Sequence, residues 1–174
     1  MPFERGYLQV YTGNGKGKTT AAIGLGVRAA GAGLKVIMIQ FMKGRRYSEL
    51  DALKGIPNFE VHQHGRDEFV SKEHPEQIDI DLAKEGLSHA KRAVMSARYD
   101  LVILDELNVA IDYGLVPLDE VLDLISTRPR NVELVITGRY APKEVLDVAD
   151  LVTEMKEMLH FYNNGVEARK GIEY

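Results

Sequence analysis

Six short apolar segments predict β-strands along this chain of 174 residues, at residues 7–11, 35–41, 59–62, 101–104, 132–137 and 150–155. The second segment is almost entirely apolar, which is typical of a strand covered on both faces of a sheet. The last segment, at residues 150–155, is expected to be another central strand.

Helices are predicted between these strands, at residues 20–30, at residues 48–54, from Pro75, from Pro117 and from Pro142. The helix from Pro75 is the longest, and its apolar positions form one buried stripe. Residues 160–174 are expected to form turns and short extended pieces. Strands that alternate with helices predict a doubly wound α/β fold of three layers, with a mostly parallel central sheet of about six strands. A chain of this length is the size of one domain.

Composition excludes several kinds of site and partner. The 22 basic and 26 acidic residues give a net charge of -4 without long charged runs, so no nucleic acid is expected as a partner. The chain has no cysteine, which excludes disulfides, thiolate metal sites and a cysteine nucleophile, and which suits a reducing cytoplasm. No apolar stretch has the length of a membrane span, and residues 1–6 lack the apolar run of a signal peptide, so no membrane association is expected.

The segment between the first strand and the first helix carries the clearest chemistry. Its sequence, Tyr-Thr-Gly-Asn-Gly-Lys-Gly-Lys-Thr-Thr at residues 11–20, has glycine at every second position from 13 to 17. Such glycines let backbone N–H groups turn toward one space, which the positive end of the following helix also faces. This is the pattern of a phosphate-binding loop. The predicted nucleotide-binding residues here are Gly13, Asn14, Gly15, Lys16, Gly17, Lys18, Thr19 and Thr20.

Some of these residues have more specific predicted roles. The ammonium of Lys18 is expected to bind phosphate oxygens, and the hydroxyl of Thr19 or Thr20 to bind the Mg²⁺ that accompanies the nucleotide. The usual pattern has glycine at Thr12, whereas this chain has it one residue later, at Gly13. A dinucleotide-binding loop fits less well, because it needs glycine where Lys18 stands and an acid at the end of the second strand. A glycine-rich turn without a ligand is the remaining alternative.

Charged residues also follow the later strands, at the edge where open α/β sheets bind ligands. Asp105 comes directly after the fourth strand and is expected to hold Mg²⁺ beside the loop, through water. Glu106 is expected to point the other way, toward the nucleotide sugar or a second metal, or to act as an acid at a helix N-terminus. Arg139 follows the fifth strand and is predicted to reach a phosphate or carboxylate. The predicted catalytic residues are Lys18, Asp105 and Glu106, and the predicted metal ligands are Thr19 and Asp105.

Two further groups of residues each allow two interpretations. His62 ends the predicted third strand and His64 follows it, and the two either bind a metal or are ordinary polar residues at a strand end. Residues 43–46, Lys-Gly-Arg-Arg, follow the second strand and either bind an anion or form a solvated surface loop.

The chain resembles one family over almost its whole length, the ATP:corrinoid adenosyltransferases of the cob(I)alamin type with a phosphate-binding loop. The resemblance begins with the loop itself, because this family shares its late glycine. It continues in the segments Gln-Phe-Met-Lys-Gly at 40–44, Leu-Asp-Glu-Leu at 104–107, Arg-Pro at 128–129, Ile-Thr-Gly-Arg at 136–139, Ala-Asp-Leu-Val-Thr-Glu-Met at 149–155 and Gly-Ile-Glu at 171–173.

This resemblance implies a P-loop NTPase fold of the RecA-like class. It implies transfer of the 5′-deoxyadenosyl group from ATP to a reduced corrinoid, with triphosphate leaving whole from a site at residues 13–19. It also implies Mg²⁺ or Mn²⁺ as cofactor, a homodimer, a flavoprotein reductant as partner, and Phe69 on the corrinoid side of the site. The chain departs from better-known members in its lack of tryptophan and in the short segment before its first strand. The second departure implies that something other than a long N-terminal arm closes the site.

Two other functions are compatible with the sequence. An ATPase or nucleotide-dependent switch acting on a protein partner would use the same loop. A small-molecule kinase fits less well, because no separate acceptor base or arginine-rich lid is evident. Adenosyl transfer agrees with what the chain lacks, since cobalt(I) is itself the nucleophile in that reaction and no serine, cysteine or histidine nucleophile is required.

Overall fold

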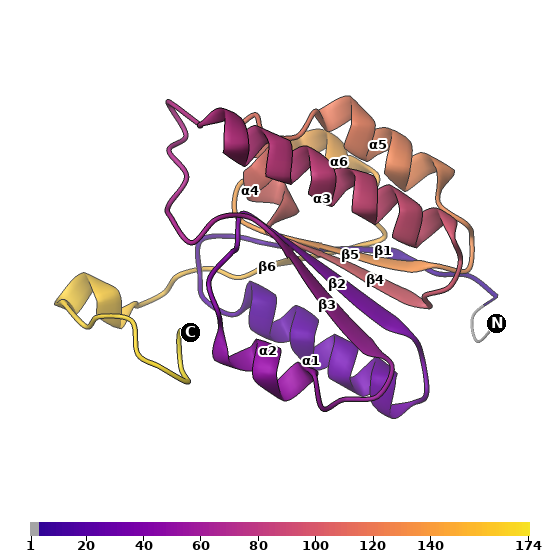
Figure 1. Ribbon diagram of the computed structural model, residues 1–174, viewed down its shortest axis with the longest axis horizontal. Coiled ribbons are helices and arrows are strands. Elements are labelled where there is room, and N and C mark those ends of the chain that lie inside the picture. The colour runs from indigo at the N-terminus through magenta and orange to yellow at the C-terminus, as the bar shows by residue number, and fades with distance from the viewer. Residues whose placement is uncertain (1–3) are drawn as a thin grey trace.

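The computed structural model, which describes residues 4–174, contains a six-stranded parallel sheet between two layers of helices (Figure 1). The spatial order of the strands is β3-β2-β4-β5-β1-β6, and every neighbouring pair is parallel. The strands are β1 (Leu8–Thr12), β2 (Val36–Phe41), β3 (Phe59–His64), β4 (Leu101–Asp105), β5 (Glu133–Thr137) and β6 (Leu151–Glu154).

Helices cover both faces of this sheet, as Figure 1 shows. One face carries α1 (Lys18–Gly31) and α2 (Ser48–Leu53). The other face carries α3 (Gln77–Met95), α4 (Leu107–Asp112), α5 (Leu118–Thr127) and α6 (Lys143–Asp147). A 3-10 helix, η1 (Phe161–Asn164), lies in the tail that follows β6. The predicted three-layer α/β class is confirmed.

The alternation of side chains along β4 determines which residues face each layer. Val102 and Leu104 belong to the core under α3, whereas Leu101 and Ile103 belong to the core under α1. Each fully buried side chain of this kind contributes about 1.5–3 kcal/mol of hydrophobic stabilisation. The same alternation directs Asp105, the last residue of the strand, toward the side of α1.

Helix α1 lies unusually close to the sheet because its inward positions are small. A Cβ atom added to Gly26 would lie 2.4 Å from the ring of Phe59, on β3. Ala22 and Ala29 complete the buried side of the helix. This close approach brings the first residues of α1 directly over the carboxyl ends of the central strands.

Helix α3 begins two residues later than its predicted start at Pro75, since a capping box fixes the first turn. The backbone N–H of Glu76 donates to the carboxylate of Asp79 at 3.1 Å, and the side chain of Glu76 accepts from the backbone of the same turn. The short helix α4 was not predicted.

Two expectations about strands are corrected. The segment predicted as a central strand at 150–155 is β6, an edge strand that pairs with β1 alone. Its apolar residues Leu151 and Val152 are 44% and 47% exposed. Apolar content indicated burial there, but within residues 4–174 no further strand covers the outer edge. The third strand is longer than predicted and continues to His64, which pairs with Phe41 of β2.

Two expectations concern the chain as a whole. No helix within residues 4–174 has the length and apolar character needed to cross a bilayer. The expectation about the N-terminal segment involves residues 1–3, which lie outside the described residues.

Candidate active site

The glycine-rich loop joins β1 to α1 and packs against the end of β6. Gly13 and Gly17 have φ values of 96° and 119°, which side chains rarely adopt. The backbone N–H of Gly15 donates to the carbonyl of Met155 at 2.6 Å. A Cβ atom at Gly13 would lie 2.5 Å from that same carbonyl oxygen. The loop is therefore shaped by glycines at positions where no other residue fits.

Lys18 lies at the centre of the loop. Its Nζ donates to the carbonyl oxygens of Gly13 and Gly15, at 2.7 Å each. Burial lowers the pKa of Lys18, and the nearby charge of Glu106 opposes that effect without cancelling it. The ammonium thus lies where the loop backbone curves around it, which is the position expected of a phosphate-binding lysine.

A polar cluster forms where the carboxyl ends of β2, β4 and β5 meet the start of α1. Thr19 and Thr137 donate their hydroxyls to Oδ1 of Asp105, at 2.8 and 2.7 Å. Gln40 donates its Nε2 to Oδ2 of Asp105 at 3.1 Å. The predicted metal ligands Thr19 and Asp105 are therefore in direct contact, and their hydroxyl and carboxylate oxygens are of the type that Mg²⁺ prefers.

Lys43 completes this cluster, and sequence reasoning missed its role. Its Nζ lies 2.7 Å from Oδ2 of Asp105 and 3.3 Å from Oγ1 of Thr19. Burial lowers the pKa of Lys43, but the charges of Asp105 and Glu106 outweigh it, so that the pKa is raised. The interpretation of residues 43–46 as a solvated loop holds for Arg45 and Arg46, which form exposed ion pairs. It is wrong for Lys43. The position of Lys43, two residues beyond the end of β2, is the feature of the sequence that could have indicated its place in the site.

Glu106 does not have the extended backbone that the sequence-based expectation had assumed. Its φ of 61° turns the chain at the N-cap of α4, and its side chain lines the cavity described below. Burial raises the pKa of Glu106, and the charge of Asp105 adds to the rise, against the opposing charges of Lys43 and Lys18. The residue is thus both at a helix N-terminus and in the candidate site.

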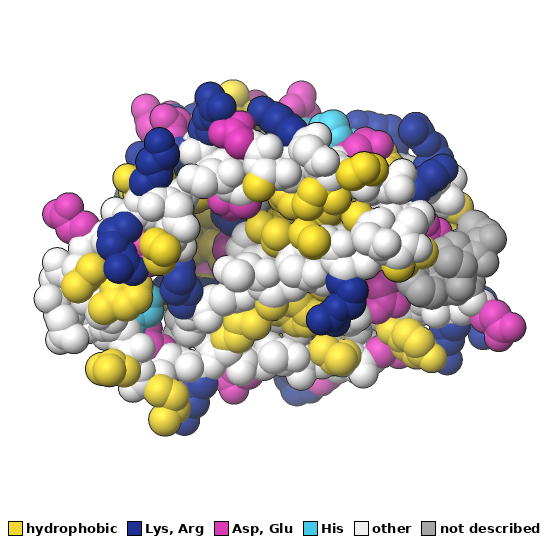
Figure 2. Space-filling view, turned by 90° about the horizontal axis from the view of Figure 1, so that it is seen from below, with side chains coloured by type: hydrophobic (Ala, Val, Ile, Leu, Met, Phe, Trp, Pro, Cys, Tyr) yellow, Lys and Arg dark blue, Asp and Glu magenta, His cyan; other side chains and the backbone are white. Residues whose placement is uncertain are grey.

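These elements enclose a cavity of about 710 Å³ in front of the loop. A hollow opens beside the tail in the space-filling view of Figure 2, which faces α1 and α2. Gly13 and Asn14 are not among its lining residues. The cavity is lined by the predicted site residues Gly15, Lys16, Gly17, Lys18, Thr19, Thr20, Glu106 and Arg139 and also by Lys43 and Tyr47. Four of these, three lysines and one arginine, are basic, which suits a polyphosphate.

The tail forms one wall of this cavity through residues 171–174. The Nζ of Lys16 donates to the carbonyl of Ile172 at 3.2 Å and lies 3.8 Å from the carboxylate of Glu173. The hydroxyl of Ser48 donates to the carbonyl of Tyr174 at 2.9 Å. These contacts join the tail to the loop and to α2, and so hold this wall of the cavity in place.

A second, smaller cavity of about 140 Å³ adjoins the first, because Lys43 and Tyr47 line both. Phe69 and Tyr113 are the other aromatic residues in its lining. Phe69 is 91% exposed, and the guanidinium of Arg45 lies 5.4 Å from the centre of its ring. An apolar ring exposed to this degree beside a cavity is a surface available for a ligand.

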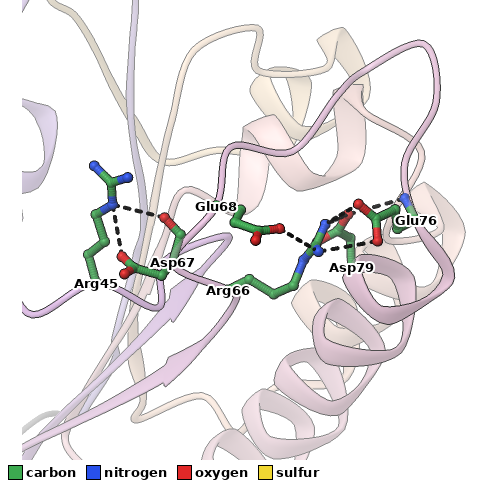
Figure 3. Close-up of polar contacts among 6 residues, drawn as sticks. All are labelled: Arg45, Arg66, Asp67, Glu68, Glu76 and Asp79. Carbon is green, nitrogen blue, oxygen red and sulfur yellow. Dashed lines mark hydrogen bonds and ion pairs between the residues drawn. The ribbon is translucent and has the colours of Figure 1, made fainter.

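Arg66 forms hydrogen bonds with three acidic residues, Glu68, Glu76 and Asp79, as Figure 3 shows. Phe69 lies within the segment from Arg66 to Asp79. Nε and Nη2 of Arg66 donate to the two carboxylate oxygens of Asp79 on α3, at 2.8 and 2.9 Å. Its Nη1 donates to Glu68 at 2.8 Å, and its Nη2 to Glu76 at 3.0 Å. The guanidinium of Arg66 therefore holds the beginning of the segment 66–79 against the first turn of α3.

The two histidines that were candidates for a metal site, His62 and His64, both contact the ring of His89 on α3. Nε2 of His64 lies 3.1 Å from Nδ1 of His89 on α3, so one ring donates to the other. The described part of the chain has no group of three or more His, Asp, Glu or Cys arranged to hold a metal. These contacts favour the other interpretation, in which His62 and His64 are polar residues at a strand end.

This histidine pair predicts a pH dependence of stability. Burial lowers the pKa of His64 and of His89, with the charges of His62 and Arg92 adding to the effect and Glu85 and Glu60 opposing it. An unfolded chain therefore binds protons at these sites more readily than the folded chain, and stability falls as the pH drops below about 6.5.

The measurement is urea unfolding of the protein and of a His89→Gln variant between about pH 7.5 and 5.5. This range brackets the ordinary histidine pKa of about 6.5. The loss of stability toward acid pH is expected to be smaller in the variant. Equal losses in the two proteins would contradict the assignment.

Comparison with known proteins agrees with this geometry. Residues 4–174 match the model of the family described as ATP:corrinoid adenosyltransferase BtuR/CobO/CobP. A corrinoid adenosyltransferase of Escherichia coli strain K12 is 39% identical over 174 residues, which cover 98% of this chain and 87% of that protein. The corresponding protein of Salmonella typhimurium is 38% identical with the same coverage. One from Pseudomonas aeruginosa is 39% identical over 98% of this chain and 85% of its own length. The chain belongs to the ATP:corrinoid adenosyltransferase family.

Proposed function

We propose that this protein transfers the 5′-deoxyadenosyl group of ATP to the cobalt(I) of a reduced corrinoid and releases triphosphate. The observation that carries the proposal is the arrangement of two adjoining cavities, one in front of the phosphate-binding loop and one beside Phe69, with Lys43 and Tyr47 lining both. A transfer between two substrates needs their reacting atoms side by side, which separate sites would not provide.

The loop side of the site fits the leaving group of this reaction. The cobalt electron pair forms a bond to the 5′ carbon of the ribose, and the bond from that carbon to the phosphate oxygen breaks, so the negative charge grows on triphosphate. We assign the stabilisation of that charge to Lys18, the backbone N–H groups of the loop and Arg139, because Lys18 lies within the loop and Arg139 lines the same cavity. To do so, Lys18 exchanges its contacts with the carbonyls of Gly13 and Gly15 for contacts with phosphate oxygens.

We further propose that Thr19 and Asp105 hold a Mg²⁺ or Mn²⁺ ion that enters with ATP. Their oxygens are adjacent, 2.8 Å apart, and hydrogen bonds from Thr137 to Oδ1 and from Gln40 to Oδ2 orient the carboxylate. The ion would supply positive charge to the phosphates. Glu106, beside Lys18 and Arg139, is assigned to the nucleotide end of the cavity, where its carboxylate can accept from a sugar hydroxyl.

The corrinoid is assigned to the side of Phe69. The exposed ring and the neighbouring Arg45 offer an apolar face and a donor to a large planar ligand with amide side chains. Because the reaction consumes cobalt(I), an electron donor is needed, and a flavoprotein suits that role. A homodimer and a cytoplasmic location are proposed on the same family resemblance.

The test is an incubation of the purified protein with ATP, Mg²⁺ and chemically reduced cobalamin. The expected product has a cobalt–carbon bond that light destroys, which absorption spectra taken before and after illumination detect. An ATPase or switch would instead release phosphate without any effect of cobalamin, and that result would reject the proposal.

A further inference from the structure

Lys43 brings a positive charge to the same two groups that are assigned to the metal ion. It follows β2, and its side chain, 13% exposed, turns inward to the end of β4. Its Nζ lies 2.7 Å from Oδ2 of Asp105 and 3.3 Å from Oγ1 of Thr19. The ammonium thus touches both proposed metal ligands at once.

The other donors to Asp105 show why this charge matters. Thr19, Thr137 and Gln40 donate from uncharged groups. The side chain of Asp105 is 0% exposed, so no solvent compensates its charge. A carboxylate buried in this way needs a cation. Among the described residues that donate to Asp105, Lys43 supplies that cation.

A divalent ion at Thr19 and Asp105 would lie within a few ångströms of this ammonium and repel it. The ammonium of Lys43 can move away from Asp105, because Lys43 has a flexible side chain and lines both cavities. A change of rotamer carries the ammonium away from Asp105 and into the shared space, where the negative charge of a bound triphosphate would hold it.

We propose that Lys43 is the resident counter-ion of the metal subsite, that a divalent cation must displace it, and that it thereby makes metal binding depend on nucleotide. This inference rests on the proposed function, since it concerns the metal that accompanies ATP. Without nucleotide, the ammonium stays on Asp105 and the metal binds weakly. With ATP present, the phosphates attract the ammonium and the carboxylate becomes free for the metal.

The test measures Mn²⁺ binding in the absence of nucleotide, by the loss of the electron paramagnetic resonance signal of free Mn²⁺. A Lys43→Met variant, which keeps the length of the stem and loses the charge, is expected to bind Mn²⁺ at least about tenfold more tightly than the unchanged protein. Lys43→Arg, which keeps the charge, is expected to remain weak. Lys54→Met is the matched control, because Lys54 is exposed, pairs with Asp51 and lines neither cavity.

Equal or weaker Mn²⁺ binding by Lys43→Met, including no binding by either protein, would overturn the inference. Circular dichroism checks that each variant is folded, and Lys43→Gln replaces Lys43→Met if the latter is not. The failure of the proposed function has a different signature, since the unchanged protein would then form no light-sensitive product. An active protein in which Lys43→Met leaves Mn²⁺ binding unchanged refutes the role of Lys43 alone.

Discussion

Replacement of Lys18 by alanine is expected to lower kcat/KM for adenosyl transfer by at least about a hundredfold. The lysine ammonium lies inside the curve of the loop, 2.7 Å from two of its carbonyls, and no other ammonium makes those contacts among the described residues. Without it, the charge that develops on triphosphate loses the ammonium that we propose stabilises it. Initial rates of formation of the light-sensitive product, at several ATP concentrations, give the measurement.

The control for this variant is Lys84→Ala, on the exposed side of α3. It removes the same charge from the chain without touching the loop, so its rate should equal that of the unchanged protein. If Lys18→Ala retained most of the activity, the loop would not be the site of the leaving group.

Replacement of Phe69 by alanine is expected to lower kcat/KM for the corrinoid by about tenfold or more, because it removes an exposed aromatic ring that lines the second cavity. The KM for ATP should stay the same, because Phe69 does not line the nucleotide cavity. The melting temperature should also stay the same, since a side chain exposed to 91% contributes little to the core. Steady-state kinetics with each substrate varied in turn separates these effects.

Tyr162→Ala serves as the matched control, because Tyr162 is also an exposed aromatic residue but lies in the tail and lines neither cavity. It should leave both kinetic constants unchanged. Normal corrinoid kinetics in Phe69→Ala would contradict the assignment of the corrinoid to the second cavity.

The sequence predicts the framework of the site well, because that framework depends on local patterns. The alternation of β4 places Ile103 and Asp105 on one face, and the loop glycines precede a helix that begins at Lys18. Parallel strands then bring Asp105 to Thr19, although 86 positions separate them. Each step follows from side-chain period and chain direction alone.

What the sequence does not predict depends on contacts between distant residues. Lys43 belongs to a basic segment whose arginines are solvated, and its inward turn is visible only once β2 and β4 are adjacent, with 62 positions between Lys43 and Asp105. The wall formed by residues 171–174 likewise depends on how the tail turns back, which no periodic pattern records. The edge position of β6 follows from strand order and not from its apolar residues.

The central claim is that the loop holds three linked phosphates as a single leaving group. Phosphorus-31 magnetic resonance of the reaction mixture tests it most directly, with the light-sensitive corrinoid product counted in the same sample. One intact tripolyphosphate is expected for each corrinoid product. The appearance of ADP with orthophosphate, or of AMP with pyrophosphate, in place of tripolyphosphate would contradict it.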